Sequence, residues 1–127
     1  MVSRDQRLRK RADFDSVRSR GNRVSDRLFV LTVAPSELDQ TRWGLAVSRR
    51  VGNSVVRNRV KRKIRESIRD MRCINGLDVI VSARPAAATA ASGSVRSSLY
   101  KLASRSGLTP AITAGAKISN PDSPLTS

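Results

Sequence analysis

The chain has 127 residues, which suits one domain, and 25 Lys and Arg against 10 Asp and Glu give it a formal net charge of +15. This charge predicts a polyanionic partner, nucleic acid before an anionic membrane, and the excess of Arg over Lys favours nucleic acid, although a GC-rich genome would give the same bias. With no His and one Cys, Cys73, the sequence lacks the usual general base, the commonest zinc ligand and any internal disulfide.

The sequence shows neither a membrane-spanning segment nor a signal peptide. No apolar run approaches the ~20 residues of a membrane-spanning helix. The N-terminus is basic, but the apolar region of a signal peptide does not follow it. We therefore expect a cytoplasmic protein without a membrane partner.

The first predicted elements are a basic arm over residues 1–11 and a short helix. Asp13 is placed to cap this helix, which carries Phe14 and Val17 and ends at Gly21. The two acids Asp13 and Asp15 near its start suit capping and the helix dipole better than metal ligation.

Two strands are predicted next, at 28–34 and 42–48. Their apolar residues alternate, which places one set on a common face of each strand: Phe29, Leu31 and Val33, then Trp43, Leu45 and Val47. The short connection between the strands predicts that they pair as a hairpin. A short piece near Val24 is a further candidate for an edge strand.

The second half of the chain is predicted to hold a long helix, a strand and a last helix. Asn53 and Ser54 offer a cap for the long helix, which runs from about Val55 to Arg72. The strand follows, with Leu77, Val79 and Val81, and ends at Arg84-Pro85. The run PAAATAAS fits a weak helix or a loop, and the last helix spans Ser94 to Ser106 around Val95, Leu99 and Leu102. Residues 1–106 thus form one domain, and the low-charge, Pro-containing residues 107–127 form a disordered tail.

The stretch Val51–Glu66, VGNSVVRNRVKRKIRE, carries six cations and one acid. At ~100° per residue, one arc of the helix is apolar: Val56, Val60, Ile64, Ile68 and Met71. The adjacent arc is cationic, with Arg57, Lys61, Arg65, Arg69 and Arg72, extended by Asn58 and Arg62. A solvated helix face usually mixes both signs, so this pattern predicts a face that binds nucleic-acid phosphates above a face that packs on the core.

The ordered set GLAVSRRVGNSVVRNRVKRKIRE, then GLDVIVSARPAA, with ADF near the start, resembles the protein subunit of bacterial ribonuclease P. The resemblance covers about residues 4–106, and its most specific part is Arg57-Asn58-Arg59 followed by Lys61, Arg62 and Arg65. It implies an α/β fold, an α+β sandwich similar to the second domain of ribosomal protein S5, in the order helix, three strands, long helix, strand, helix. It also implies a left-handed crossover between parallel strands, where topology rules alone favour a right-handed one.

The resemblance further implies a function. The family's holoenzyme removes the 5′ leader from precursor tRNA, and its chemistry is carried by a catalytic RNA with bound Mg²⁺. The protein binds that RNA and helps to hold the leader, and no protein partner is required. No catalytic or metal-ligating residue is therefore expected in this chain. The residues implied to bind the catalytic RNA are Arg57, Asn58, Arg59, Lys61, Arg62 and Arg65.

Leader binding is implied in a groove between the first helix and the sheet, by Phe14, Ser48, Arg49, Arg50 and Asn53. Phe14 either stacks on a base or plugs the core. The two arginines either clamp phosphates or are plain loop cations, and Asn53 either binds the leader or only caps the helix. Arg18 stands where the family often has a second aromatic residue.

Two rival readings remain open. A structural RNA-binding protein of ribosomal type explains the charge and the small fold equally well, but not the Arg-Asn-Arg block with its flanks. A self-sufficient nuclease requires a set of catalytic side chains that the sequence lacks.

Overall fold

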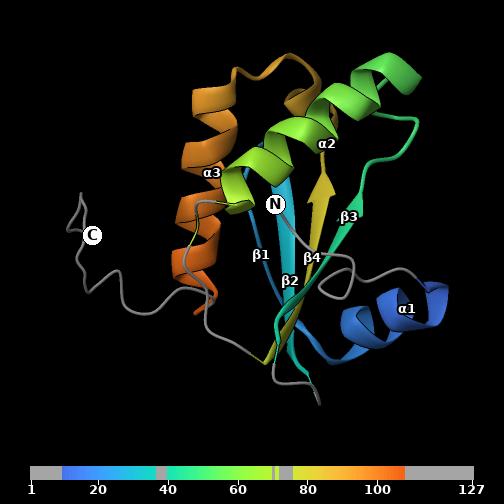
Figure 1. Cartoon of the computed structure of the whole chain (residues 1–127), viewed down its shortest axis with the longest axis vertical. Coiled ribbons are helices and arrows are strands. Elements are labelled where there is room, and N and C mark those ends of the chain that lie inside the picture. The colour runs from blue at the N-terminus through green and yellow to red at the C-terminus, as the bar shows by residue number, and fades with distance from the viewer. Residues whose placement is uncertain (1–9, 37–39, 70, 72–75, 108–127) are drawn as a thin grey trace.

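The computed structural model describes residues 10–36, 40–69, 71 and 76–107, which form a sheet with helices on both faces (Figure 1). The helices α2 and α3 cover one face together with the 3-10 helix η2, and α1 packs on the other. The elements follow in the order α1 Arg11–Arg20, β1 Asn22–Ser25, β2 Phe29–Pro35, β3 Arg42–Ala46, α2 Ser54–Arg69, β4 Leu77–Ala83, η2 Pro85–Thr89 and α3 Ser92–Arg105.

The order of strands across the sheet is β1-β2-β4-β3. The hairpin predicted between strands 28–34 and 42–48 is wrong. These strands are β2 and β3, and β4 lies between them, antiparallel to β2 and parallel to β3. Val79, Ile80 and Val81 of β4 are fully buried, and such a continuous apolar run requires cover on both faces and a neighbour at each edge. The expected edge strand near Val24 is confirmed as β1.

The parallel strands β3 and β4 are joined through α2. In Figure 1 both arrows point the same way, β4 lies to the left of β3, and α2 passes in front of them, which makes the connection left-handed. This agrees with the fold that the resemblance implies and departs from the common right-handed rule.

The helix α1 begins earlier than predicted and is not capped by Asp13. Its N-cap is Lys10, which makes no side-chain cap hydrogen bond. The Asp13 carboxylate lies instead 3.9 Å from Arg42 Nη1 on β3, so an ion pair takes the place of the cap. Gly21 ends the helix where α1 meets β2, and a Cβ there would lie 2.7 Å from Thr32 Cγ2. The close approach of these two backbones therefore requires glycine.

The helix α2 has the predicted cap and the predicted apolar face. Asn53 Oδ1 accepts a hydrogen bond of 3.0 Å from the Val56 amide, so Asn53 is the cap. Val60, Ile64 and Ile68 are buried against the sheet, and Val56 and Met71 pack partly buried beside them. The described helix ends at Arg69.

The Ala-rich run forms η2 and an extended link rather than one helix. Ala87 is buried, and α3 then begins at Ser92, with Val95, Leu99 and Leu102 buried as predicted. The predictions for the basic arm up to residue 9, for Cys73 and Arg72, and for the tail from residue 108 lie outside the described residues.

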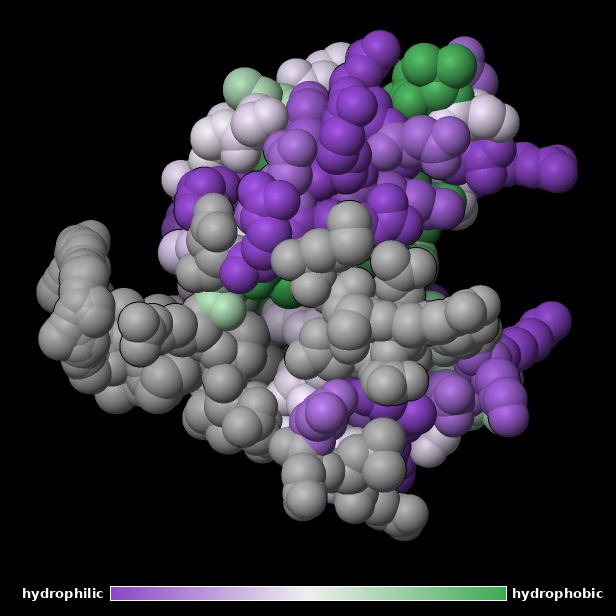
Figure 2. Space-filling model, viewed as in Figure 1, coloured by the Kyte–Doolittle hydropathy of each residue, from purple (hydrophilic) through white to green (hydrophobic). Residues whose placement is uncertain are grey.

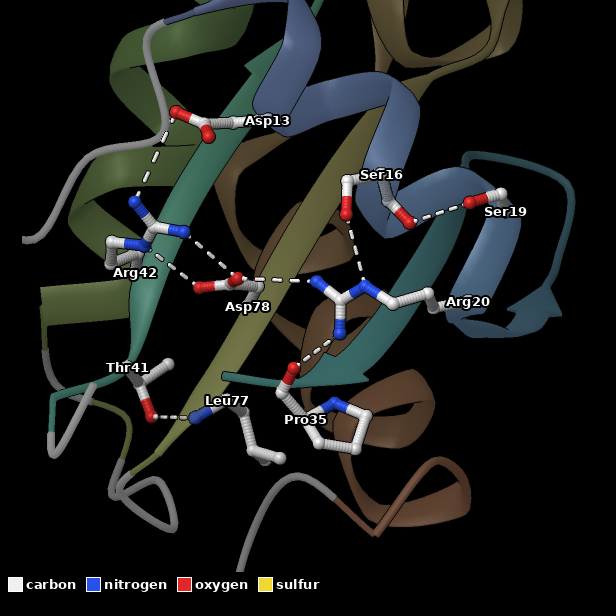
Figure 3. A network of polar contacts seen from close by, with 9 residues as sticks. All are labelled: Asp13, Ser16, Ser19, Arg20, Pro35, Thr41, Arg42, Leu77 and Asp78. Atoms are coloured by element: carbon white, nitrogen blue, oxygen red, sulfur yellow. Dashed lines mark hydrogen bonds and ion pairs between the residues drawn. The ribbon is translucent and has the colours of Figure 1, made fainter. Parts of the chain in front are cut away.

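A buried carboxylate links α1 to the two strands beneath it (Figure 3). Asp78 on β4 is only 2% exposed, and its two oxygens each accept a hydrogen bond of 2.9 Å from Arg42 on the neighbouring strand. These hydrogen bonds raise the pKa of Arg42 against the opposing effect of burial. Arg20 of α1 approaches Asp78 Oδ2 at 3.7 Å and donates to the Pro35 carbonyl at 2.6 Å.

A second acid, Asp26, organises the turn between β1 and β2. Its Oδ1 accepts from the Leu28 and Phe29 amides, and its Oδ2 accepts from Ser98 Oγ of α3 at 2.5 Å. Burial raises the pKa of Asp26, but these hydrogen bonds and the charge of Lys101 outweigh burial, so the pKa lies below its usual value. The ionised carboxylate is therefore the form that holds the turn to α3.

Replacing Asp78 with Asn should destabilise the fold, because Arg42 would lose its ionised partner in a largely buried position. Breaking a buried pair costs roughly 3 kcal/mol where one partner keeps some contact with water. Urea unfolding at neutral pH measures this change. The control is Asp15→Asn on the exposed side of α1, which should change stability by less than ~0.5 kcal/mol. Equal stabilities for the two variants would contradict the proposed role of the network.

The depressed pKa of Asp26 predicts an acid-dependent contribution to stability. The folded pKa lies below the unfolded value of ~3.9, so the contribution is complete above that pH and is lost as pH falls through the folded pKa. The stability difference between the wild type and Asp26→Asn should therefore be present at neutral pH and shrink below about pH 4. A difference that is constant over this range, measured by urea unfolding, would exclude the effect.

Candidate nucleic-acid interface

The outward face of α2 is a continuous cationic surface. Its apolar arc is fixed to the sheet, so the opposite arc is turned to solvent, and Figure 2 shows hydrophilic side chains gathered over this helix. Arg57 and Lys61 are half-buried at the margin of the core, and the remaining predicted residues are exposed: Asn58, Arg59, Arg62 and Arg65. Arg57, Lys61 and Arg65 follow one another at a spacing of one helical turn, ~5.4 Å.

Arg59 does not lie in that row. At ~100° per residue it is turned about 160° away from Lys61, toward the flank that carries Lys63. Lys63 Nζ donates a hydrogen bond of 2.8 Å to the Ala90 carbonyl at the start of α3, so this flank faces the neighbouring helix. The Arg-Asn-Arg block therefore presents its two guanidinium groups to two sides of α2, with Asn58 between them.

Arg57 differs from the other cations of the row in its surroundings. Its Nη2 lies 3.4 Å from Ser54 Oγ, and its Nε is shielded from solvent without a hydrogen-bond partner among the described residues. A buried donor without a partner costs ~1–3 kcal/mol. Arg57 is thus less hydrated than the exposed Arg65 of the same row.

A tight turn after β3 brings four predicted residues to the start of α2. The Val51 amide donates to the Ser48 carbonyl at 3.1 Å, and the Arg50 amide donates to Ser48 Oγ at 3.3 Å. Val51 is buried and anchors the turn, which leaves Arg49 and Arg50 exposed. Asn53 follows as the cap of α2, so its side-chain oxygen is already engaged within the protein.

Phe14 lies on the other face of the sheet, under α1. It is partly buried against Val17, Ala34 and Ile80, and the Arg18 guanidinium lies 5.7 Å from the centre of its ring. The ring is thus partly buried, with a cation over it. This packing fits the role of a core plug, and stacking of Phe14 on a base stays a prediction.

Beside α1, part of the sheet has little cover. Val30, Ser82 and Ala46 pair side by side across β2, β4 and β3, and all three are only partly buried. We call this row the open sheet strip. It leads from the Phe14 cluster, which includes Ala46, to the turn that begins at Ser48. Val30 and Ser82 were missed in the sequence, although their alternation opposite to the core residues of their strands could have revealed them.

The described acids are mostly engaged within the protein. Asp13 and Asp78 pair with Arg42, and Asp26 holds its turn, while Asp15 of α1 and Glu66 of α2 are exposed. Among the described residues there is no group of three or more His, Cys, Asp or Glu side chains that could hold a metal ion. In the same part of the chain, no helix has the length and apolarity needed to cross a membrane. The interface is thus suited to binding polyanions.

The chain is similar to known proteins in sequence and in fold. The family model Ribonuclease P matches residues 2–107. The ribonuclease P protein component of Clostridium kluyveri is 39% identical over 106 residues, which cover 80% of this chain and 95% of that protein. The RNase P protein of Staphylococcus aureus superposes with a TM-score of 0.76 at 31% identity over 83% of this chain and 98% of the other. The protein from Thermotoga maritima gives 0.70 at 29% identity over 78% and 96%.

Changing Arg57, Lys61 and Arg65 together to Ala should leave the protein folded and weaken its binding to RNA. A plot of log K against log salt has a negative slope, and each lost phosphate contact makes it shallower by ~0.7–0.9. The magnitude of the slope should therefore decrease by about 2–3. The binding constant is measured over a series of salt concentrations, with circular dichroism as the check on folding. Ile64→Asp is the opposite case, since a charge in the core should unfold the domain. A triple variant that unfolds, with normal binding per folded molecule, would contradict the assignment of the two faces.

Proposed function

The chain belongs to the ribonuclease P protein family, and we propose that it acts as the protein subunit of ribonuclease P, binding the catalytic RNA and the 5′ leader of precursor tRNA. In this role it promotes the endonucleolytic removal of the leader, which gives the mature 5′ end. The observation that carries the proposal is the helix α2, whose apolar arc is buried in the core while its outer arc presents a row of cations. RNA binding and a role in tRNA processing follow from the family itself.

The α2 face is proposed as the contact with the catalytic RNA. A helix fixed to a sheet presents its cations in a preformed row, so little side-chain and backbone order has to be gained on binding. Arg57, Lys61 and Arg65 would bind phosphates in sequence along one strand, with Arg62 and Asn58 beside them. Arg59 would contact RNA on the flank toward α3. Arginine suits this role because its planar fork donates to two phosphate oxygens at once.

The open sheet strip is proposed as the seat of the single-stranded leader. Its small and half-buried side chains leave room for an extended strand, the partly buried Phe14 would stack on a base, and Arg49 and Arg50 are exposed at its end. Stacking on an aromatic ring contributes ~1–3 kcal/mol per base. With Arg18 in place of a second ring, part of that contribution passes to a guanidinium plane.

The chemistry is proposed to belong to the RNA. Mg²⁺ would supply an activated water and stabilise charge on the scissile phosphate, and the described residues contain no cluster that fits such an ion. The contribution of this chain is to neutralise phosphates, which lowers the repulsion between the two RNAs and favours the metal ions that the RNA holds. The proposed place of action is the cytoplasm, where a bacterial precursor tRNA is processed.

A cleavage assay on precursor tRNA at low Mg²⁺ tests this function. It compares the catalytic RNA alone, the protein alone and the two together. Cleavage should require both components at physiological salt, because the protein supplies charge neutralisation that the RNA alone gains only from high Mg²⁺. The Arg57, Lys61 and Arg65 triple variant should lose most of the stimulation.

Two results would overturn the proposal in different ways. No stimulation by the protein, together with tight binding to ribosomal RNA, would favour the structural RNA-binding role. Cleavage by protein freed of RNA would show a self-sufficient nuclease. A control variant of equal charge, Lys10→Gln with Arg11→Gln and Arg96→Gln, removes three cations away from the α2 row and should retain the stimulation.

A further inference from the structure

A second group of cations lies at the opposite edge of the sheet from β3. Arg27 is exposed on the turn after the edge strand β1, and Lys101 and Arg105 are exposed on α3. We call this group the α3–β1 edge. Neither the family's signature block nor the open sheet strip includes any of these residues.

The α3–β1 edge is a fixed surface. Ser98 of α3 donates to Asp26 Oδ2 at 2.5 Å, which ties the helix to the turn, and the same carboxylate binds the amides of Leu28 and Phe29. Arg105 Nη1 lies 3.5 Å from the Ser25 carbonyl, so this side chain contacts the end of the edge strand β1. The cations are therefore presented by a turn and a helix that hold each other in place.

The charge of this edge is almost wholly of one sign. Asp26 is the acid within β1, its turn and α3, and its oxygens are already used by three hydrogen bonds within the protein. Lys101 and Arg105 are four residues apart and therefore share one flank of α3, and Ser98 of the same helix binds Asp26, the residue before Arg27. A purely structural edge has no need of this excess, and like charges held close together repel one another when no anion lies between them.

We propose that the α3–β1 edge binds the phosphate backbone of a second segment of the catalytic RNA, separate from the segment on the α2 row. The inference rests on the proposed function, since it takes the same RNA as the partner. The helices α2 and α3 lie side by side on one face of the sheet, so an RNA large enough to cover α2 can reach across to the outer flank of α3 (Figure 1). The proposed leader site lies on the other face, under α1, which favours the catalytic RNA over the leader as the occupant.

The test uses the full-length protein with Arg27, Lys101 and Arg105 changed to Gln, which removes the charges and keeps much of each side chain. Its affinity for the catalytic RNA should fall at least tenfold. The magnitude of the negative slope of log K against log salt should decrease by about 2–3. The control is the Lys10, Arg11 and Arg96 triple Gln variant, which loses the same charge elsewhere and should fall far less. Urea unfolding of both variants checks that they are equally folded.

Hydroxyl-radical footprinting of the catalytic RNA decides whether the two surfaces bind different segments. The edge variant should lose one protected segment while the α2 triple variant loses another. A fall in affinity equal to that of the control, or loss of the same protected segment by both variants, overturns the inference and leaves the proposed function standing. Failure of the wild-type protein to bind the RNA or to stimulate cleavage would overturn the proposed function itself, and this inference with it.

Discussion

The pairing of Arg42 with the buried Asp78 fixes the part of the molecule on which the rest is built. It lies between β3 and β4, the one parallel pair in the sheet, and sets their register where each strand begins. The register of β3 decides where that strand ends, and so where the turn from Ser48 and the start of α2 are placed. Through Asp13 and Arg20 the same cluster holds α1 on the opposite face. One ionic cluster thus bears on the position of α2 and on that of α1 beside the open sheet strip.

The fold turns an excess of positive charge into separate surfaces. Three of the described acids, Asp13, Asp26 and Asp78, are used to hold the structure together, so few remain to neutralise the outside. Cations that face solvent therefore lie on α2, on the turn after β3 and along the α3–β1 edge, as well as on α1. Binding RNA on these surfaces relieves a repulsion that the folded protein otherwise bears alone.

What the sequence could predict was mostly what a single element decides. The two arcs of α2 and the cap at Asn53 follow from helical periodicity and local hydrogen bonding, and both are present. The strand order could not be found in this way, because β4 inserts between two strands that are neighbours in the sequence. The open sheet strip depends on that order, which is why Val30 and Ser82 were missed. Asp13 fits a capping pattern locally, but a cation 29 positions later in the sequence, Arg42, binds it instead.

The central place of β4 also bears on how the chain is made. Phe29 pairs with Ala83, so the middle of the sheet forms only after most of the domain has left the ribosome. Until then β2 and β3 have no shared neighbour, and pairing over such long separations in sequence slows folding. The growing chain is meanwhile strongly cationic and surrounded by nucleic acid. During synthesis, the strands of this fold therefore keep unpaired edges for longer than the strands of a fold built from local hairpins. Anions that screen the positive charge should shorten the time before the strands pair.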